Sequence, residues 1–230
     1  MKKNLLLFIL FLCFIPNVVF AEELVPNGES SILIEATTGK IIFEKNIDKK
    51  LSIASMTKMV AQIIILEEVE NNKIKWDDVV TVSRNASGMG GSQIYLEEGE
   101  KMTVRDLMKG ISVASANDAT VALAEYISGT EEKFVKRMND KVKELGLKNT
   151  NFMNPHGLDE DGHYTTAYDL SLIARELLKH EKILEFTSTY EDYIDVAGEN
   201  HWLVNTNKLV RFYEGVDGLK TGYTHEAGYC

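Results

Sequence analysis

Cysteine is almost missing from this sequence of 230 residues. Its two cysteines are Cys13, in an N-terminal segment that we expect to be removed, and Cys230. A chain left with Cys230 alone can form no internal disulfide, so its fold must rest on a core. Hydrophobic residues make up 44% of the chain, and this length and composition can bury one sizeable core, in one or two lobes.

Positive charge is also scarce. The chain has 25 Lys and Arg residues against 35 Asp and Glu residues, a formal net charge of −10 at pH 7. An acidic balance of this size argues against a nucleic-acid partner and against simple electrostatic adhesion to anionic lipid. No internal repeat and no low-complexity tract is present, which is typical of an ordinary globular protein.

The longest hydrophobic run, LLLFILFLCFI, stands close to the N-terminus. Lys2 and Lys3 precede it, and the small-residue exit Val19-Phe20-Ala21 follows. This order is typical of a secretory signal peptide. We therefore expect residues 1–21 to be removed and the protein to be exported to the extracytoplasmic side. The run is short for a membrane span, so an uncleaved anchor is the less favoured alternative.

Segments of β character lie at both ends of the remaining chain, with helical segments between them. SSILIEATTGKIIFEKN predicts a hairpin that turns at Thr38-Gly39, and YEDYIDVAGENHWLVNTNKLV and GVDGLKTGYT return to β and turn character. The intervening sequence predicts a short extended piece in KWDDVVTVS, a Gly-rich loop in GMGGSQIYLEEGE, and helices from Thr103 to about Gly110, Asp118 to about Ser128, Thr130 to Gly146, and Thr165 or Thr166 through TAYDLSLIARELLKH. We therefore expect a mixed α/β (α+β) fold, with an antiparallel sheet built from both chain ends beside a helical lobe.

A further helix is predicted to begin near Ser55, because apolar residues from Met59 onward recur at helical spacing. Lys58 stands three residues after Ser55, where a capping box would place Glu or Gln, and its charge lies near the positive end of the helix dipole. Residues at i and i+3 share one face of a helix, so the amine can reach the hydroxyl.

Two interpretations of this Ser55 and Lys58 pair stay open. One is an N-cap serine beside a lysine whose amine reaches solvent. The other is nucleophilic catalysis, in which a neutral Lys58 takes the proton of Ser55 as the hydroxyl attacks a carbonyl. The pKa of Lys58 must then fall from about 10.4 to near 7, worth roughly 4 kcal/mol, which needs desolvation or a second nearby cation.

The segment GVDGLKTGYT offers that second cation in Lys220. Gly222 would let another backbone approach this strand closely. The segment is either a charged edge strand with a glycine kink, or an edge to which an extended peptide adds as a further strand. In the second case Lys220 and Thr221 would bind the terminal carboxylate of the peptide.

The pattern S-x-N occurs twice, at Ser83-Arg84-Asn85 and at Ser115-Ala116-Asn117. The second lies in a tight link between two predicted helices, which fixes side chains over a cleft better than a loop does. We therefore favour Ser115 and Asn117 and interpret Ser83 as an ordinary turn residue.

The motifs SMTK, SAN and KTG, in this order, resemble the three signatures of the penicillin-recognising serine acyl transferases. The longer segments ASMTKMV, SANDATVALAE, NPHGLD and DGLKTGYTHEAGYC are similar to those of D-alanyl-D-alanine carboxypeptidases, which are low-molecular-weight penicillin-binding proteins. The resemblance covers essentially the whole mature chain. It implies a β-lactamase/transpeptidase-like fold, with residues 22–230 as one catalytic domain.

The resemblance also implies a reaction and its partners. The substrate would be the peptidoglycan stem peptide, which acylates Ser55 and releases its terminal D-alanine; β-lactam antibiotics would be covalent inhibitors, and no metal or other cofactor takes part. The implied roles are Ser55 as nucleophile, Lys58 as base, Ser115 in proton transfer to the leaving amine, Asn117 on the substrate backbone and on Lys58, Lys220, Thr221 and Gly222 on the strand that binds the carboxylate, and the backbone N–H groups of Ser55 and Tyr223 as oxyanion hole.

The chain departs from the family pattern at its end. In the family, the strand that carries KTG is followed by further strands and a helix, whereas this sequence stops at Cys230. We therefore expect a C-terminally incomplete catalytic domain, with peripheral membrane association only through a C-terminal segment absent here.

Three alternatives remain. A class A β-lactamase would add E-x-x-L-N, but the nearest segment, ELGLKN from Glu144, has the wrong spacing and fits a helix end. A metallopeptidase could use four residues of NPHGLDEDGHYT, but H-E-x-x-H is missing and a solvated loop is expected instead. Those four residues are His156, Asp159, Asp161 and His163. The third alternative is a module that binds β-lactam or peptidoglycan without turnover.

Overall fold

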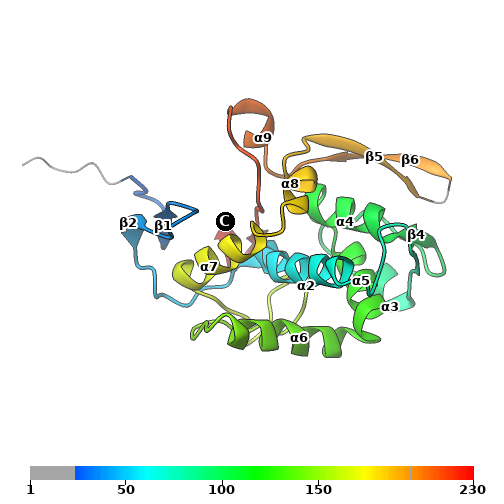
Figure 1. Cartoon of the computed structure of the whole chain (residues 1–230), viewed down its shortest axis with the longest axis horizontal. Helices are drawn as coiled ribbons and strands as arrows, with labels where there is room; N and C mark the ends of the chain where they lie inside the picture. Colours follow the sequence, from blue (N-terminus) through cyan, green and yellow to red (C-terminus); the bar gives the residue numbers. More distant parts are fainter. Residues whose placement is uncertain (1–23, 197) are drawn as a thin grey trace, which may run out of the picture.

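A computed structural model describes residues 24–196 and 198–230 of the chain (Figure 1). The expected signal peptide, residues 1–21, lies outside the described residues. The elements in chain order are β1 (Ser31–Ile34), β2 (Ile41–Lys45), the 3-10 turn η1 (Ala54–Thr57), α2 (Lys58–Glu70), β3 (Val79–Thr81), α3 (Arg84–Ser87), β4 (Lys101–Thr103), α4 (Val104–Val113), α5 (Asn117–Ser128), α6 (Glu131–Glu144), α7 (Ala167–Leu177), α8 (Lys182–Thr187), β5 (Glu191–Val196), β6 (Glu199–Val204), α9 (Leu209–Phe212), β7 (Tyr223–Thr224) and β8 (Gly228–Tyr229).

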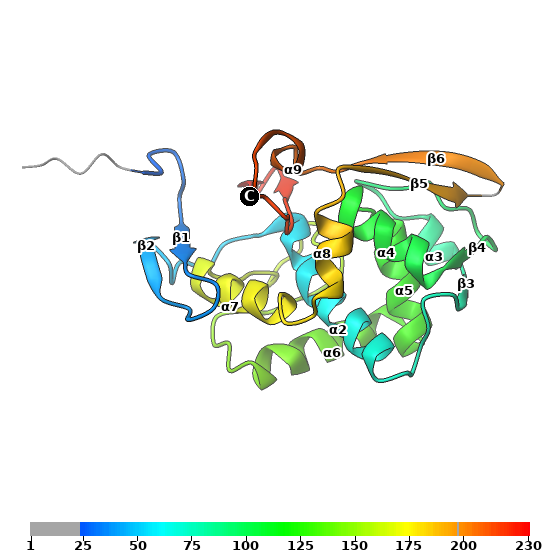
Figure 2. The same cartoon turned by 45° about the horizontal axis from the view of Figure 1, so that its top comes forward.

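Helix α2 is the central element of the fold. Every side chain from residue 58 to residue 66 is buried, as expected of a helix that lies in the core and is apolar on most of its faces. Helices α5, α6, α7 and α8 all contact it (Figures 1 and 2). The N-terminal end of α2, which follows Ser55, is therefore fixed by packing on several sides.

The predicted helices are confirmed, with changes at their ends. Thr103, Thr130 and Thr166 cap α4, α6 and α7 by accepting hydrogen bonds from backbone N–H groups. Helix α4, however, continues past Gly110 to Val113. Gly110 lies in the helix because of packing, since a Cβ atom there would stand only 2.9 Å from Cδ1 of Ile94.

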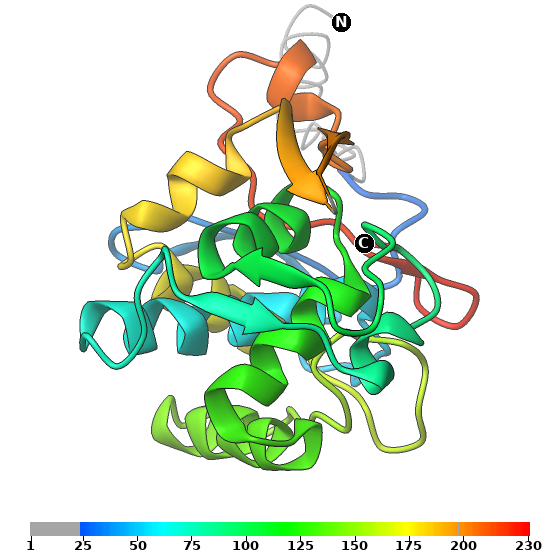
Figure 3. The same cartoon turned by 90° about the vertical axis from the view of Figure 1, so that its right-hand side faces the viewer.

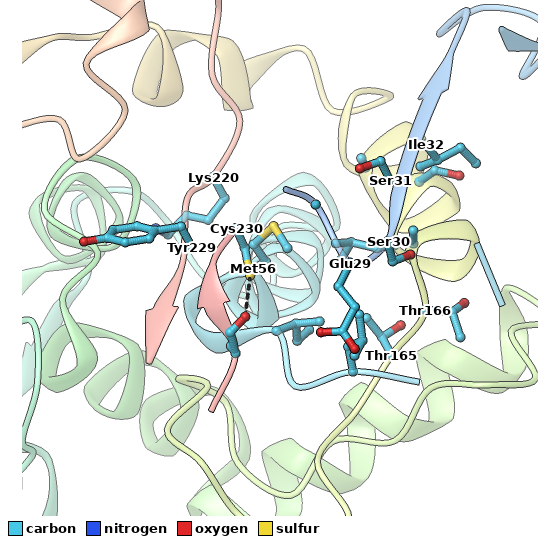
Figure 4. A pocket seen from close by; sticks show the side chains of 18 of the residues that line it. Glu29, Ser30, Ser31, Ile32, Met56, Thr165, Thr166, Lys220, Tyr229 and Cys230 are labelled. Atoms are coloured by element: carbon cyan, nitrogen blue, oxygen red, sulfur yellow. Dashed lines mark hydrogen bonds between the residues drawn. The ribbon is translucent and has the colours of Figure 1, made fainter. Parts of the chain in front are cut away.

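The strands in the described part of the chain form four separate antiparallel pairs. The β1–β2 hairpin turns at Thr38-Gly39 as predicted, and Gly39 takes the left-handed conformation at φ 74°. The mixed helix and strand content confirms the expected α+β class. The described strands of the two chain ends nevertheless do not share one sheet, because a groove of about 680 Å³ separates β1 from β8 (Figure 4).

The third pair, β5–β6, is a hairpin that lies over α4 (Figures 1 and 3). Lys109 of α4 and Asp192 of β5 form an ion pair at 2.7 Å, and Ile194 and Leu203 are buried beneath the hairpin. The short elements α3, β4 and α8 were not expected from the sequence. No helix in the described part of the chain combines the length and the apolar character that a bilayer crossing needs.

Candidate active site

The candidate active site begins with the 3-10 turn η1, which precedes α2. Ser55 lies inside this turn, and no side chain caps η1 or α2, so the predicted N-cap at Ser55 is wrong. Ala54 has a left-handed backbone at φ 47°. Gly157, at φ +89°, faces it, and a Cβ atom on Gly157 would lie 1.9 Å from the Ala54 carbonyl oxygen. Backbone strain of this kind is often stored beside a functional group.

Lys58 is fully buried, and its amine touches three oxygen atoms. Nζ lies 2.8 Å from Oγ of Ser55, 2.7 Å from Oδ1 of Asn117 and 2.7 Å from the backbone carbonyl oxygen of His156. The last two oxygens can only accept hydrogen bonds. The residues at 55, 117 and 156 come from η1, α5 and the segment before α7, so three distant parts of the chain meet at one nitrogen.

This geometry suits a neutral amine as well as an ammonium. A neutral amine has two N–H bonds, which match the two carbonyl acceptors of Asn117 and His156, and one lone pair, which then points at the Ser55 hydroxyl. In that state Ser55 donates its hydrogen bond to Nζ. The arrangement is that of a nucleophile with an adjacent general base.

The electrostatic surroundings favour the neutral amine. Burial lowers the pKa of Lys58 well below its usual range, and the charge of Lys220 lowers it further, while Asp118 acts in the opposite direction. Burial also lowers the pKa of Lys220, to about 7. The second cation that the sequence suggested therefore acts on Lys58, although desolvation is the larger cause.

Ser115 and Asn117 lie where α4 passes into α5. Ser115 is 3% exposed and has a left-handed backbone at φ 61°, which is uncommon for a residue with a side chain. The next backbone N–H, that of Ala116, bonds to the carbonyl oxygen of Gly110 at 3.0 Å. The link is tight, as predicted, and it brings Asn117 into contact with Lys58.

The amide of Asn117 has two partners. Its Oδ1 accepts from Lys58, and its Nδ2 donates to the carbonyl oxygen of Gly90 at 2.7 Å. Its backbone N–H bonds to the carbonyl oxygen of Ser92 at 2.7 Å. A Cβ atom on Gly91 would lie 2.7 Å from Nδ2 of Asn117, so there is no room for a side chain at position 91.

Asp118 anchors the same Gly-rich segment one step further along. Its buried carboxylate accepts hydrogen bonds from the backbone N–H groups of Ile94 and Leu96, both at 3.1 Å. Burial raises the pKa of this carboxyl, and the N–H donors oppose that shift. The segment GMGGSQIYLEEGE, predicted as a Gly-rich loop, is thus hydrogen-bonded to Asn117 and Asp118, the first two residues of α5.

The KTG segment lies beside η1. A Cβ atom on Gly222 would stand 2.9 Å from the Ile53 carbonyl oxygen and 3.1 Å from the backbone nitrogen of Ser55. This confirms the expected close approach at Gly222. The backbone of Gly222 also pairs with Cys230 through two hydrogen bonds of 3.0 and 2.9 Å, next to the β7–β8 pair. The predicted β run over residues 220–222 thus precedes the strand, which begins at Tyr223.

Lys220, Thr221 and Tyr223 are the neighbours of Gly222 in the KTG segment. The amine of Lys220 donates to the Thr221 carbonyl oxygen at 2.8 Å, and Tyr223 begins β7 with its side chain more than half exposed. The Thr221 hydroxyl shares a hydrogen bond of 2.8 Å with that of Thr206. Thr206 could not be predicted as a site residue, because a threonine in a polar segment has no distinctive pattern.

The first S-x-N segment lies elsewhere. The Ser83 hydroxyl caps α3 by accepting from Ala86 N–H at 3.0 Å, and it donates to Glu125 at 2.5 Å. Ser83 is therefore the N-cap of the short helix α3, where the sequence predicted an ordinary turn residue.

The loop that contains His156 and His163 is solvated only in part: both histidines are buried, whereas residues 158–162, with Asp159 and Asp161, are exposed as expected. His163 is 5% exposed; its Nδ1 accepts from the Met153 N–H, which leaves Nε2–H to donate to the Thr57 hydroxyl at 2.7 Å. Burial lowers the pKa of His163 to about 4. No cluster of three metal-binding side chains occurs within residues 24–196 and 198–230. The functional contact of this loop is the His156 carbonyl, which residue types cannot reveal.

Glu144, the nearest counterpart of a β-lactamase glutamate, is the last residue of α6. Its side chain is largely exposed and pairs with Lys141 at 2.8 Å. The interpretation of ELGLKN as a helix end is thus confirmed.

Comparisons with known proteins show the family to which the chain is similar. The sequence profile described as D-alanyl-D-alanine carboxypeptidase matches residues 19–230. The chain is 53% identical to the D-alanyl-D-alanine carboxypeptidase DacF of Bacillus subtilis (strain 168), over 99% of this chain and 60% of that protein. It is 34% identical to DacD of Escherichia coli (strain K12), over 100% of this chain and 62% of that protein. The chain thus spans about three fifths of the length of these relatives.

Solved structures of two related proteins have a similar fold. The D-alanyl-D-alanine carboxypeptidase DacD from Francisella tularensis superposes with a TM-score of 0.85 at 30% identity, covering 89% of this chain and 61% of that chain. The ampicillin-bound penicillin-binding protein D2 from Listeria monocytogenes superposes with a TM-score of 0.80 at 33% identity, covering 91% of this chain and 84% of that chain.

Proposed function

The chain belongs to the D-alanyl-D-alanine carboxypeptidase family, and on that premise we propose that it is a serine-type carboxypeptidase that removes the terminal D-alanine from peptidoglycan stem peptides. Residues 22–230 would then act as its catalytic domain. The observation that carries this proposal is the buried amine of Lys58 at 2.8 Å from the Ser55 hydroxyl, with carbonyl oxygens on its two other sides.

In the first half of the reaction, Oγ of Ser55 attacks the carbonyl carbon of the penultimate residue of the peptide. Its proton passes to the neutral amine of Lys58, which burial keeps available as a base. The oxygen of the tetrahedral intermediate accepts hydrogen bonds from the backbone N–H groups of Ser55 and Tyr223. The proximity of Gly222 to the Ser55 backbone nitrogen supports this pairing of donors.

The intermediate then collapses, and the C–N bond of the terminal residue breaks. The leaving nitrogen needs a proton, which Lys58 now holds and which the Ser115 hydroxyl relays. The product is an ester on Ser55, and D-alanine leaves. Water next attacks the ester carbonyl and gives a proton to Lys58. Lys58 returns this proton to Oγ of Ser55 as the ester C–O bond breaks, and the shortened peptide leaves.

The end of the substrate carries a carboxylate, and the KTG strand offers groups to bind it. Lys220 supplies a positive charge, and the Thr221 hydroxyl, held by Thr206, supplies a hydrogen bond. The peptide would lie along β7 as an added strand, with Asn117 on its other side. The free edge of this short strand beside Ser55 supports that placement.

A pentapeptide that ends in D-Ala-D-Ala tests the proposal, with mass spectrometry as the readout. We expect slow release of one alanine, and none from the Ser55→Ala variant. A protein that binds the peptide without ever releasing alanine would contradict the carboxypeptidase and favour a non-catalytic module.

The same nucleophile would be acylated by β-lactams, as the ampicillin-bound state of the Listeria monocytogenes protein suggests. We expect a fluorescent penicillin to label Ser55 as a long-lived adduct. Fast turnover of a chromogenic cephalosporin would indicate a β-lactamase instead. A peptidoglycan substrate would place the active protein on the extracytoplasmic side of the membrane.

A further inference from the structure

The β5–β6 hairpin has an outer face that no other part of the described chain covers. In its register Tyr193 stands opposite Trp202, and Asp195 stands opposite Asn200. Tyr193 and Trp202 are 58% and 59% exposed, although large aromatic side chains usually find cover. We call this face, made of Glu191, Tyr193, Asp195, Asn200 and Trp202, the aromatic platform.

The inner face of the hairpin explains why the platform keeps its position. Ile194 and Leu203 are buried, and Asp192 is paired with Lys109 of α4. Since side chains alternate along a strand, fixing these residues inward turns Tyr193 and Trp202 outward. Cross-strand neighbours lie about 5 Å apart at Cβ, so the Tyr193 and Trp202 side chains leave the hairpin next to each other on this face.

The platform is joined to the candidate active site through the base of the hairpin. The backbone N–H of Thr206 bonds to the Val113 carbonyl oxygen at 3.1 Å, just before Ser115, and its hydroxyl bonds to that of Thr221. Trp202 lies a short stretch of strand before Thr206, roughly 13 Å at 3.3 Å per residue. The hairpin that carries the platform is therefore connected through Thr206 to the KTG segment of the site.

We propose that the aromatic platform binds the glycan strand of peptidoglycan, a neutral chain of β-1,4-linked N-acetylated amino sugars. This inference rests on the proposed function for the choice of polymer. Aromatic rings offer flat apolar surfaces with low conformational entropy to the C–H faces of sugars. Asp195 and Asn200 flank the rings with acceptors and a donor for sugar hydroxyl groups.

Charge favours this ligand over other large partners. Neither β5 nor β6 contains Lys or Arg, and the platform carries the carboxylates of Glu191 and Asp195. An anionic lipid surface or an acidic polymer would be repelled there. A neutral polyhydroxyl ligand meets no such cost and gains hydrogen bonds to the carboxylates.

The intrinsic fluorescence of the protein can report binding, because the chain has only two tryptophans. Trp76 is packed against Phe186, with ring centroids 5.3 Å apart, whereas Trp202 is exposed. We expect a hexamer of β-1,4-linked N-acetylglucosamine to change the Trp202 emission saturably. Tyr193→Ala should weaken binding about tenfold, equal to about 1.4 kcal/mol, and Tyr168→Ala, a matched change of another exposed aromatic residue, should not.

Calorimetry with the same hexasaccharide extends the test to Trp202. Trp202→Phe should keep most of the affinity and Trp202→Ala should lose it. Trp202→Ala should also slow alanine release from insoluble peptidoglycan while leaving kcat/KM for the soluble pentapeptide unchanged. Hexasaccharide binding supports the platform even if the pentapeptide is not cleaved, so the two proposals fail separately.

Three results would overturn the inference. One is the absence of any hexasaccharide binding by the unmodified chain. The second is an emission change at Trp202 with phosphatidylglycerol vesicles but none with the sugar, which would mark a lipid-binding surface. The third is a concentration-dependent dimer in sedimentation that Trp202→Ala abolishes, which would show that a second copy covers the face.

Discussion

Replacing Gly222 by alanine adds a single methyl group at the point where the KTG strand passes η1. The new Cβ atom would meet the Ile53 carbonyl oxygen at 2.9 Å, and Cβ of Ala54 and the backbone nitrogen of Ser55 at 3.1 Å each. Gly222 does not have a left-handed backbone, so alanine introduces no conformational strain there. The substitution therefore acts only by increasing the distance between the backbone at Gly222 and the backbone of η1.

Ordinary contacts of a Cβ atom begin at 3.4 Å, so the strand must move by about 0.5 Å to relieve the closest contact. Such a shift would also displace the neighbouring Tyr223 N–H, which we propose as an oxyanion-hole donor. Misplacing a catalytic group by about 1 Å can cost a hundredfold in rate, so half of that displacement should cost about tenfold, or about 1.4 kcal/mol of transition-state stabilisation.

The second-order rate constant for acylation by a fluorescent penicillin measures this effect directly. The unmodified protein is the reference for this rate. We expect Gly222→Ala to acylate about ten times more slowly than the unmodified protein, with a similar Tm. Equal rates for the two proteins would refute the claim that the KTG segment and η1 pack closely at Gly222.

Three further predictions follow from the same geometry. The kcat/KM for the pentapeptide should fall as the pH rises through about 7, because Lys220 loses its proton there and no longer attracts the carboxylate. In a pH–rate profile, Lys220→Arg should move this alkaline decrease to higher pH. A decrease at the same pH in the variant would contradict the role of Lys220. Thr206→Val should raise KM for a peptide with a free carboxylate about fivefold, the value of one hydrogen bond to Thr221, with kcat unchanged, while Thr206→Ser keeps the wild-type KM and an unchanged KM in Thr206→Val would refute the role. The unfolding free energy should fall by roughly 3 kcal/mol between pH 6.5 and pH 4, because the unfolded state binds a proton at His163 in a range where the folded state does not; denaturant titrations of the wild type and His163→Gln measure it, and equal acid sensitivity would contradict it.

The sequence allowed the helices and the reacting pair to be predicted, because both depend on local spacing. Threonine caps and apolar periodicity mark α4, α6 and α7, and the interval between Ser55 and Lys58 is that of one helical turn. Gly222 was predictable for a similar reason, since a glycine inside a strand indicates a close neighbour.

Other parts of the site could not be predicted, because they depend on tertiary packing or on the backbone. The 3-10 turn at Ser55 lies where Gly157 packs closely against Ala54, and these two residues are about a hundred positions apart in the sequence. The His156 carbonyl is a backbone group, and every residue has one. Thr206 acquires its role only because the hairpin base meets the KTG strand.

The side chain of Asn117 has a consequence beyond its contact with the base. A planar amide cannot turn its oxygen without turning its nitrogen, and here the oxygen receives Lys58 while the nitrogen reaches for Gly90. A ligand that displaces the backbone at Gly90 would therefore also move Oδ1 of Asn117, which accepts the hydrogen bond from Lys58. The position of the Gly-rich segment and the basicity of the Lys58 amine are thus coupled through one planar amide group.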